Sequence, residues 1–383
     1  TIPITASIQQ IPQTFWNVPY NRNLLFTGRE DILSQLRAAL TSEEQPIALA
    51  QPQAISGLGG IGKTQTAVEY AYRYRDSYNA VLWARADSHD LLVSDFLLIA
   101  SLLNLPERNE QDQNKVVNAV KHWFDTHERW LLILDNADDI NMVSEFIPSS
   151  GKGHVLLTTR AHSTGTIAQR IELEKMILEE GILFLLRRAK RIKSNASLET
   201  VPETVRSQAQ ALVEAVDALP LALDQAGAYI EETGCSLSDY LRFYKTRRIR
   251  LLRMRGKDAT GHPEPVATTW ALSFEKVEQA NPVAAELLRL CAFLHPDAIP
   301  ESMIVAGASE LGPILKQVAE DEMELNEAIG ELRKYSLVKR DPELKILNIH
   351  RLVQAVIKDA MEKETQRERA ERTVQMVNRA FPD

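Results

Sequence analysis

The chain has few cysteines, few aromatic residues and no long apolar run. Only 2 of its 383 residues are cysteine and 6% are aromatic. Cys235 and Cys291 lie too far apart in the sequence to indicate a zinc knuckle or a disulfide framework, so we expect a reducing, cytoplasmic location. No stretch approaches the ~18 consecutive apolar residues of a membrane-spanning helix, and the first thirty residues lack the pattern of an export signal. We therefore expect no membrane partner.

An excess of positive charge is missing as well. The formal net charge is -8, so the chain as a whole has no electrostatic attraction for nucleic acid or anionic lipid. Hydrophobic residues make up 44% and charged residues 25%, which is the balance of a globular protein and excludes a largely disordered chain. At ~150 residues per domain, the length predicts two to three domains.

The first half of the chain alternates short apolar runs with amphipathic stretches. This alternation is typical of a parallel sheet flanked by helices, and we expect an α/β domain at 21–170 after an N-terminal extension at 1–20. The expected strands are 53–56, 80–85, 130–134 and 154–158. The expected helices are 64–75, 90–103 and 114–126.

Beyond residue 170 the pattern is helical as far as 255, which predicts an all-α domain at 171–255. A linker rich in Gly, Pro and His is expected at 256–265. A third domain at 266–360 contains several helices and then a short hairpin, 337–339 with 345–349, and we interpret it as a winged-helix domain. The segment 361–383 is typical of a charged helix whose sparse apolar stripe cannot be buried alone, so we expect it to lead towards a further domain.

The strongest motif is the segment 57–64, GLGGIGKT, which matches the P-loop pattern G-x-x-x-x-G-K-[ST]. Glycines let backbone amides turn onto phosphate oxygens, and the N-terminus of the following helix adds partial positive charge. Lys63 is expected to reach the β- and γ-phosphates, and the Thr64 hydroxyl to bind Mg²⁺. The predicted nucleotide-binding residues here are Gly57, Gly59, Gly60, Ile61, Gly62, Lys63, Thr64 and Gln65.

The expected metal-binding carboxylate comes from an apolar run that ends in an acid, at 130–135. Asp135 is predicted to hold the same Mg²⁺, directly or through water. A second carboxylate is normally wanted beside it to orient the attacking water, but Asn136 occupies that position. Asp138 or Asp139 is a candidate base, or both belong to a solvated turn, so slow hydrolysis is expected.

The expected strand at 154–158 is followed by Thr159 and Arg160. An arginine in this position can sense a γ-phosphate through charge-assisted hydrogen bonds, and the alternative is an ordinary surface arginine. We assign Arg160, with Lys63 and Asp135, to the predicted catalytic residues.

Six segments occur in a fixed order along roughly residues 20–360: 26–30 (FTGRE), the P-loop, 131–135, 159–160, 219–222 (LPLA) and 349–352 (IHRL). This ordered set resembles the NB-ARC branch of the signal-transduction STAND NTPases. Relatives include plant intracellular immune receptors, the animal apoptosome-forming adaptor and bacterial proteins with helical-repeat sensors. The resemblance implies a P-loop α/β nucleotide-binding domain, an all-α helical domain and a winged-helix domain, with ADP or ATP and Mg²⁺ as ligands.

The resemblance also implies ligand contacts for the nucleotide base. Gly28 and Arg29 match the family's first motif, in which the arginine and adjacent backbone lie beside the base. Pro220, followed by Leu221, matches the proline that packs on adenine and closes the helical domain over it. A rigid apolar ring suits that contact because it offers stacking area at little entropic cost.

His350 matches the sensor histidine that reaches the β-phosphate of ADP from the winged-helix domain; the family motif usually continues with Asp, and here Arg351 follows. The resemblance therefore implies a switch that ADP holds closed and that ADP/ATP exchange opens for self-association and effector activation. The implied partners are an adenine nucleotide, a C-terminal helical-repeat sensor and an N-terminal effector domain, both outside this chain.

Two other functions are alternatives to the switch. A small-molecule kinase needs a second substrate site and an arginine-bearing lid, for which the basic run 187–193 is a candidate. A transcription regulator or nucleic-acid-binding ATPase would use the winged helix, because such domains enter DNA grooves. However, 261–360 contains ten Lys and Arg against sixteen Asp and Glu, a net charge of -6, which phosphates repel. The basic stretch 245–257 is a solvated helix face or contacts an acidic surface, so nucleic acid is not an expected partner.

Overall fold

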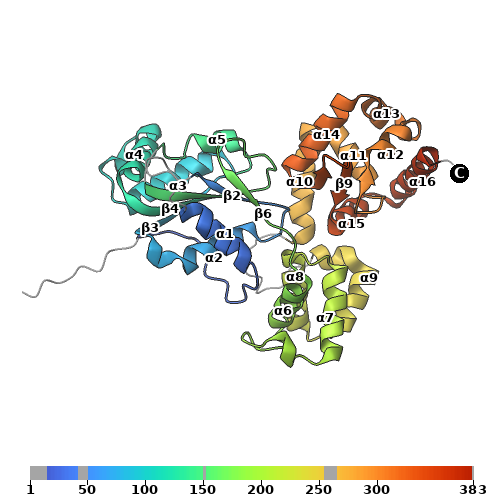
Figure 1. Cartoon of the computed structure of the whole chain (residues 1–383), viewed down its shortest axis with the longest axis horizontal. Helices are drawn as coiled ribbons and strands as arrows, with labels where there is room; N and C mark the ends of the chain where they lie inside the picture. Colours follow the sequence, from blue (N-terminus) through green and yellow to red (C-terminus); the bar gives the residue numbers. More distant parts are fainter. Residues whose placement is uncertain (1–14, 42–50, 150–151, 254–264, 382–383) are drawn as a thin grey trace, which may run out of the picture.

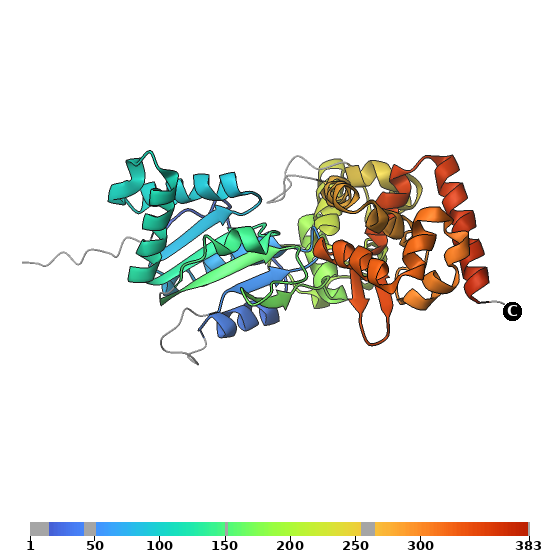
Figure 2. The ribbon, with the colours of Figure 1, turned by 90° about the horizontal axis from the view of Figure 1, so that it is seen from above.

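The computed structural model describes residues 15–41, 51–149, 152–253 and 265–381 (Figure 1). The chain forms three units: an N-terminal α/β unit, a helical unit and a C-terminal unit of helices with a small sheet. Seen from above, the α/β unit occupies one end of the molecule and the C-terminal unit the other (Figure 2).

Six parallel strands form the sheet of the α/β unit in the order β1-β3-β4-β5-β2-β6. The strands are β1 (Phe15–Trp16), β2 (Gln53–Ser56), β3 (Ala80–Arg85), β4 (Glu128–Asp135), β5 (Lys152–Thr159) and β6 (Gln169–Glu172). The last six residues of β4 are all buried, because helices cover both faces of a parallel sheet and leave little room for alternation with polar residues.

The helices of this unit divide between the two faces of the sheet. They are α1 (Glu30–Thr41), α2 (Lys63–Arg73), α3 (His89–Leu102), α4 (Gln113–Thr126) and α5 (Ile140–Ser144). Leu131 and Ile133 of β4 pack in the same core as α1 and α2, whereas Leu132 and Leu134 pack in the core that contains α3 and α4. Alternate residues of one strand thus supply two separate cores.

All the strands and helices expected before residue 170 are present, and the parallel sheet is confirmed. Two strands were missed: β1, which lies before residue 20, and β6, which spans residue 170. Phe15 and Trp16 pair with β3, while Gln169–Glu172 pair with β2 in parallel register. Both strands are edges of the sheet and carry a weak apolar signal, because an edge strand is paired on one side only.

The helical unit comprises α6 (Leu178–Arg188), α7 (Glu203–Ala215), α8 (Pro220–Thr233) and α9 (Leu237–Arg253). Pro220 occupies the first turn of α8, where its fixed φ favours helix initiation and its missing N–H costs nothing. Gly234 ends the helix with φ +69°, the left-handed conformation that glycine adopts most easily. This placement fixes the start of α8, which faces the P-loop.

The C-terminal unit begins with α10, and most of the expected linker (254–264) lies outside the described residues. Its sheet has the antiparallel order β7-β9-β8, which includes the expected hairpin and one strand, β7, that was not expected. The elements are α10 (Val266–Ala280), α11 (Pro282–Cys291), β7 (Ile299–Pro300), α12 (Glu301–Ala306), α13 (Gly312–Glu320), α14 (Glu322–Lys334), β8 (Val338–Asp341), β9 (Ile346–Ile349), α15 (Arg351–Ala360) and α16 (Lys363–Ala380).

The last helix, α16, is the charged helix expected at 361–383. Met376 is fully buried and packs so closely on Gly307 that a Cβ there would lie 2.3 Å from the methionine side chain. Val374 and Phe381, two residues of the expected apolar stripe, remain exposed. One turn of α16 is therefore anchored to the C-terminal unit while the stripe is mostly uncovered.

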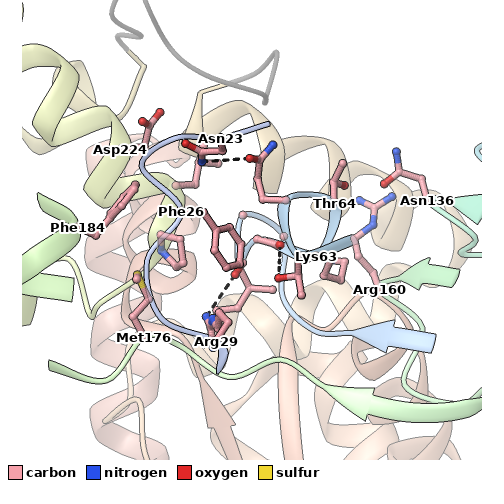
Figure 3. A pocket seen from close by; sticks show the side chains of 18 of the residues that line it. Asn23, Phe26, Arg29, Lys63, Thr64, Asn136, Arg160, Met176, Phe184 and Asp224 are labelled. Atoms are coloured by element: carbon pink, nitrogen blue, oxygen red, sulfur yellow. Dashed lines mark hydrogen bonds between the residues drawn. The ribbon is translucent and has the colours of Figure 1, made fainter. Parts of the chain in front are cut away.

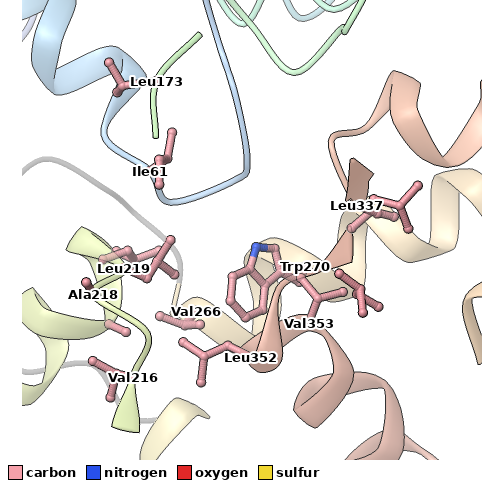
Figure 4. Close-up of a cluster of buried hydrophobic side chains, with 14 of the residues drawn as sticks. Ile61, Leu173, Val216, Ala218, Leu219, Val266, Trp270, Leu337, Leu352 and Val353 are labelled. Atoms are coloured by element: carbon pink, nitrogen blue, oxygen red, sulfur yellow. The ribbon is translucent and has the colours of Figure 1, made fainter. Parts of the chain in front are cut away.

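One apolar cluster joins the three units (Figure 4). Ile61 comes from the P-loop, Leu219 from the segment before α8, and Trp270 and Leu352 from the C-terminal unit, and all four are buried. The units are therefore docked through a shared core. Among the described residues, no helix combines the length and the apolar character needed to cross a bilayer.

Candidate nucleotide-binding site

A cavity of about 360 Å³ lies where the three units meet. The α/β unit contributes the P-loop and a segment before α1, α6 and α8 contribute residues of the helical unit, and α10 contributes Lys276. Of the predicted site residues, those that line the cavity are Arg29, Gly59, Gly60, Ile61, Gly62, Lys63, Thr64, Gln65, Arg160, Pro220 and Leu221. Gly28, Gly57, Asp135 and His350 are not on its wall.

The P-loop links β2 to α2 through glycines in conformations that other residues avoid. Gly57, Gly60 and Gly62 have φ values of +143°, +79° and +99°. A Cβ on Gly62, at the start of α2, would meet no atom within 4 Å, so this end of the helix opens on free space. The first turn of α2 also lines the cavity, and a helix N-terminus of this kind favours an anion.

Two consecutive P-loop carbonyls accept hydrogen bonds from the other two units. The Gly59 carbonyl accepts from the indole N–H of Trp270 on α10, at 3.1 Å. The Gly60 carbonyl accepts from the backbone N–H of Leu221 on α8, at 3.2 Å. A Cβ on Gly60 would lie 3.0 Å from the Leu221 side chain, so the P-loop and the start of α8 are in close contact. The P-loop is therefore part of both inter-unit interfaces.

Lys63 is buried and its Nζ donates to two backbone carbonyls, Gly57 at 2.8 Å and Leu58 at 3.1 Å. In the part of the chain that the structure describes, no carboxylate forms a salt bridge with it. Burial lowers the pKa of the ammonium group to about 8, partly offset by the charges of Asp138 and Asp135. A buried cation of this kind fits a polyphosphate, which would supply the missing negative charge.

Asp135 and Thr64 are adjacent at the carboxyl edge of the sheet. Asp135 is 2% exposed, and its Oδ1 accepts hydrogen bonds from the hydroxyls of Thr64 at 2.9 Å and Thr158 at 2.5 Å. Burial raises the pKa of this carboxyl group, and the two threonines oppose the shift. A hydroxyl beside a carboxylate fits Mg²⁺, which takes few protein ligands and completes its shell with phosphate oxygens and water. The described residues contain no cluster of three or more metal-ligating acids, histidines or cysteines.

Arg160 connects the cavity with the C-terminal unit. Its Nε donates to Asp138 Oδ2 at 2.8 Å, and its Nη1 donates to the hydroxyl of Ser273 on α10 at 2.9 Å. Its backbone carbonyl accepts from the Ser336 hydroxyl at 2.6 Å. The guanidinium group thus lies on the wall of the cavity while it bridges two units.

Both acids considered as the base have structural partners. Asp138 is paired with Arg160 through its side chain and also accepts from the Arg160 backbone N–H at 2.7 Å. Asp139 caps α5 by accepting from the backbone N–H of Met142 at 3.1 Å. A side chain that caps a helix is held at the helix end, and Asp139 is not among the residues that line the cavity.

The opposite end of the cavity is mostly apolar. Figure 3 shows Met176 and Phe184 there, with Thr64, Asn136 and Arg160 at the other end. Pro220 and Leu221 complete the apolar lining, which suits a flat purine ring. Gly28, with φ +73°, lies just behind this wall, where a Cβ would collide with Glu180 of α6. The predicted role of Gly28 stays a prediction, but its side-chain-free backbone allows α6 to approach.

His350 begins α15 and is largely buried against the helical unit. Its Nδ1 accepts from the Leu352 backbone N–H at 3.2 Å, its Nε2 lies 3.3 Å from Asp217 Oδ2, and its ring centroid is 5.6 Å from that of Trp270. Burial lowers the pKa of the imidazole to about 4, although Asp217 opposes the shift. A direct contact with the β-phosphate stays a prediction, since His350 reaches the P-loop here through Trp270. Arg351 is exposed, 3.7 Å from Asp297.

Several residues at the site were missed by the sequence analysis, among them Asp87, Trp270 and Lys276. Asp87 stands two positions after the expected strand 80–85, so a wider search for acids beyond strand ends would have found it. Trp270 and Lys276 belong to α10, more than two hundred residues beyond the P-loop. No local pattern marks them, because their proximity to the P-loop depends on the docking of the units.

Comparisons with known proteins agree with this geometry. Residues 29–190 match the profile described as "NB-ARC domain", and residues 274–366 match one described as "Domain of unknown function (DUF7779)". A nucleotide-binding leucine-rich repeat (NLR)-like protein of Hyaloscypha variabilis is 30% identical over 96% of this chain and 38% of its own length. The regulatory protein AfsR of Streptomyces griseus is 25% identical over 82% of this chain and 32% of its own length. The chain therefore spans about a third of the length of these curated relatives.

Among solved structures, the Walker-type ATPase of Pyrococcus abyssi is similar over 89% of this chain and 98% of its own, with a TM-score of 0.52 and 13% identity. That likeness concerns the fold alone. The NB-ARC match and the long alignment with the NLR-like protein go further, and they include the P-loop that lies between β2 and α2. The chain belongs to the NB-ARC-type P-loop NTPases of the STAND class.

Proposed function

We propose that this chain is the core of a nucleotide-dependent signalling switch, which binds ADP or ATP with Mg²⁺ in the cavity and hydrolyses ATP slowly. The observation that carries the proposal is the pair of hydrogen bonds on consecutive P-loop carbonyls, from Trp270 to Gly59 and from Leu221 to Gly60. A phosphate bound by this loop contacts the element that holds the other two units. The free energy of nucleotide binding and the free energy of docking between the units are then coupled.

The γ-phosphate acts through Arg160 in this proposal. In the docked arrangement the guanidinium group is shared between Asp138 and Ser273 of α10. A γ-phosphate is a stronger partner for arginine than a serine hydroxyl, because both groups are charged. ATP therefore withdraws Arg160 from α10 and favours release of the C-terminal unit, whereas ADP leaves the contact intact. A differential affinity of about 5.5 kcal/mol would shift the populations almost completely.

His350 contributes to the closed form by holding the C-terminal unit against the helical unit. Its Nε2 lies 3.3 Å from Asp217 Oδ2, and its ring lies beside that of Trp270, whose indole N–H donates to the Gly59 carbonyl of the P-loop. A change at the P-loop can therefore reach His350 through Trp270. We keep the predicted role of His350 as a sensor of the diphosphate on this basis, with Gly28, Arg29 and Pro220 as contacts of the base.

Mg²⁺, when bound by Thr64 and Asp135, would neutralise charge on the phosphates. Lys63 and the N-terminus of α2 supply further positive charge for the same oxygens. These groups belong to the protein's own framework and need no rearrangement of the sheet. The expected rate is slow, because Asn136 replaces the acid that would orient water.

The C-terminal unit is proposed to be of the winged-helix type. The order α11, β7, α12, α13, α14, β8, β9 and the sheet order β7-β9-β8 support this assignment. Self-association in the ATP state, a C-terminal helical-repeat sensor, an N-terminal effector and a cytoplasmic location belong to the same proposal. The much greater length of the curated relatives is consistent with further domains in them.

The nucleotide content of the purified protein tests the switch most cheaply. We expect acid extraction and chromatography to release close to one ADP per chain from protein to which none was added, because residues of all three units line the cavity. Added ATP analogue with Mg²⁺ should displace it. Protein that is free of nucleotide and binds none in titration would contradict the proposal.

Transcription regulation is the second candidate, because one relative is named a regulatory protein. The net charge of -6 over 261–360 argues against direct contact of this unit with DNA. A gel shift with random duplex at low and moderate salt separates the two. Salt-sensitive binding would favour the second candidate, and no shift would favour the switch.

A further inference from the structure

Asp87 places a carboxylate beside the position where Asn136 replaces an acid. It follows β3, which pairs with β4 so that Arg85 lies opposite Asp135. The backbone N–H of Ala86 donates to the Asp135 carbonyl at 2.6 Å, so the two strand ends remain together past the last residue of the sheet. Asp87 and Asn136 both line the cavity, at the end where Thr64 and Arg160 lie.

The other acids near this end already have partners. Asp135 is buried and accepts from two threonine hydroxyls, Asp138 is paired with Arg160, and Asp139 caps α5. Among the described residues, Asp87 and Asp224 are the carboxylates that line the cavity, and Asp224 is paired with Arg188 beside the apolar end. Asp87 is therefore the acid that faces the phosphate end and remains accessible to water.

Asn136 lines the same cavity as Asp87 and follows the last residue of the neighbouring strand, β4. Asn136 has φ +63°, a left-handed conformation that asparagine tolerates better than most residues, and its N–H donates to the Thr158 hydroxyl at 3.0 Å. Asn136 lies close enough to Asp87 to lower the pKa of that carboxyl group, which opposes the effect of burial. Strained conformations of this kind are often retained where they position functional groups. Asn136 is thus suited to orient Asp87 instead of acting on water itself.

The electrostatic surroundings favour a carboxylate that can accept a proton. Partial desolvation raises the pKa of Asp87, the nearby charge of Asp138 raises it further, and Asn136 and Arg160 oppose the shift. A carboxylate whose pKa lies above its ordinary value is a stronger base.

We propose that Asp87 is the general base of ATP hydrolysis in this chain and that Asn136 positions it. The inference rests on the proposed function, because it requires ATP in the cavity. Asp87 accepts a proton from a water molecule as the water oxygen bonds to the γ-phosphorus. The bond from that phosphorus to the bridging β-γ oxygen breaks, ADP leaves with the bonding electron pair, and Asp87 then returns the proton to solvent. The products are ADP, inorganic phosphate and one proton.

Single-turnover release of labelled phosphate from ATP, with ATP affinity measured in parallel, tests this role. We expect Asp87→Asn to bind ATP within about threefold of wild type and to lose about 100-fold or more in hydrolysis rate, the usual contribution of a positioned base. Asp87→Glu should recover part of the rate. Asn136→Ala should reduce the rate less than Asp87→Asn while leaving ATP affinity nearly unchanged.

Asp139→Asn is the matched control, because asparagine is as good a helix cap as aspartate. We expect it to hydrolyse ATP at the wild-type rate. Wild-type hydrolysis in Asp87→Asn, or loss of hydrolysis in Asp139→Asn alone, would overturn the assignment. Wild-type protein that binds no ATP would instead overturn the proposed function, so the two failures are distinct.

Discussion

The indole N–H of Trp270 donates to the carbonyl of Gly59 at 3.1 Å, which joins α10 of the C-terminal unit to the phosphate-binding loop. Trp270 is 2% exposed, and its ring also lies beside that of His350. The relationship links the P-loop to a unit more than two hundred residues further along the chain. It also means that docking of the C-terminal unit is sensitive to the orientation of a P-loop peptide.

Substitution Trp270→Phe removes the donor and retains most of the ring. We expect docking of the C-terminal unit to weaken by about 0.5–1.5 kcal/mol, the usual worth of one hydrogen bond, and more if the Gly59 carbonyl is left buried without a partner. Amide hydrogen exchange of α10 and the P-loop should accelerate. Trp83→Phe is the control, since Trp83 is equally buried but its indole N–H has no partner among the described residues. Equal exchange in both variants would contradict the role of Trp270.

Substitution Lys63→Ala should weaken ADP binding by about tenfold to a hundredfold, because hydrogen bonds between charged groups contribute roughly 1.5–3 kcal/mol. Isothermal titration measures the affinity directly. The exposed Lys121, whose Nζ contacts the Glu145 carbonyl on the surface, provides the control Lys121→Ala. If Lys63→Ala binds ADP with unchanged affinity, the assignment of the P-loop to the ADP-binding site is contradicted.

Substitution Arg160→Gln should reduce the discrimination between ATP and ADP. The variant retains a hydrogen-bonding side chain but loses the charge that a γ-phosphate would attract. The ratio of dissociation constants for ADP and a non-hydrolysable ATP analogue should change by about tenfold. Arg129→Gln is a suitable control, because Arg129 is exposed and contacts backbone carbonyls away from the cavity. A ratio that stays at the wild-type value would show that Arg160 does not sense the third phosphate.

Acidification should weaken the closed form through His350. Its pKa of about 4 in the folded protein lies below the ordinary value, so the stability that depends on neutral imidazole is complete above about pH 6.5 and is lost as the pH falls towards 4. Between about pH 7.5 and pH 5 the loss is roughly 2 kcal/mol. The nearby charge of Asp217 raises the pKa of His350, and the charges of Lys175 and Arg351 lower it.

The measurement is the difference in urea unfolding between wild type and His350→Gln at each pH. The partly buried histidines His154 and His162 also have pKa values of about 4 and contribute equally to both proteins, so their effect cancels. We expect the wild type to lose more stability than the variant on acidification. Parallel pH dependence in the two proteins would contradict the assignment.

Most of the α/β fold was predictable because its signals are local. A run such as 130–135 is apolar throughout and ends in an acid, and the P-loop motif fixes the strand before it and the helix after it. The missed edge strands, β1 and β6, have one unpaired side and need fewer apolar residues. Lys63 and Thr64, which belong to that motif, line the cavity, and their contacts with a nucleotide stay a prediction.

Contacts between units were beyond the reach of the sequence. Trp270 resembles any apolar core residue of an amphipathic helix until α10 is docked on the P-loop. His350 was identified by its motif, but its neighbours Asp217 and Trp270 could not be, because they come from two other elements. The partner of a side chain depends on the relative placement of units, and no periodicity encodes that placement.

The central claim is that the nucleotide in the shared cavity determines whether the C-terminal unit stays docked. Small-angle X-ray scattering of the chromatographically monodisperse protein, loaded with ADP or with a non-hydrolysable ATP analogue and Mg²⁺, tests it most directly. The account predicts the compact dimensions of the present structure with ADP and a larger radius of gyration with the ATP analogue. The same radius with both nucleotides, at confirmed full occupancy, would contradict it.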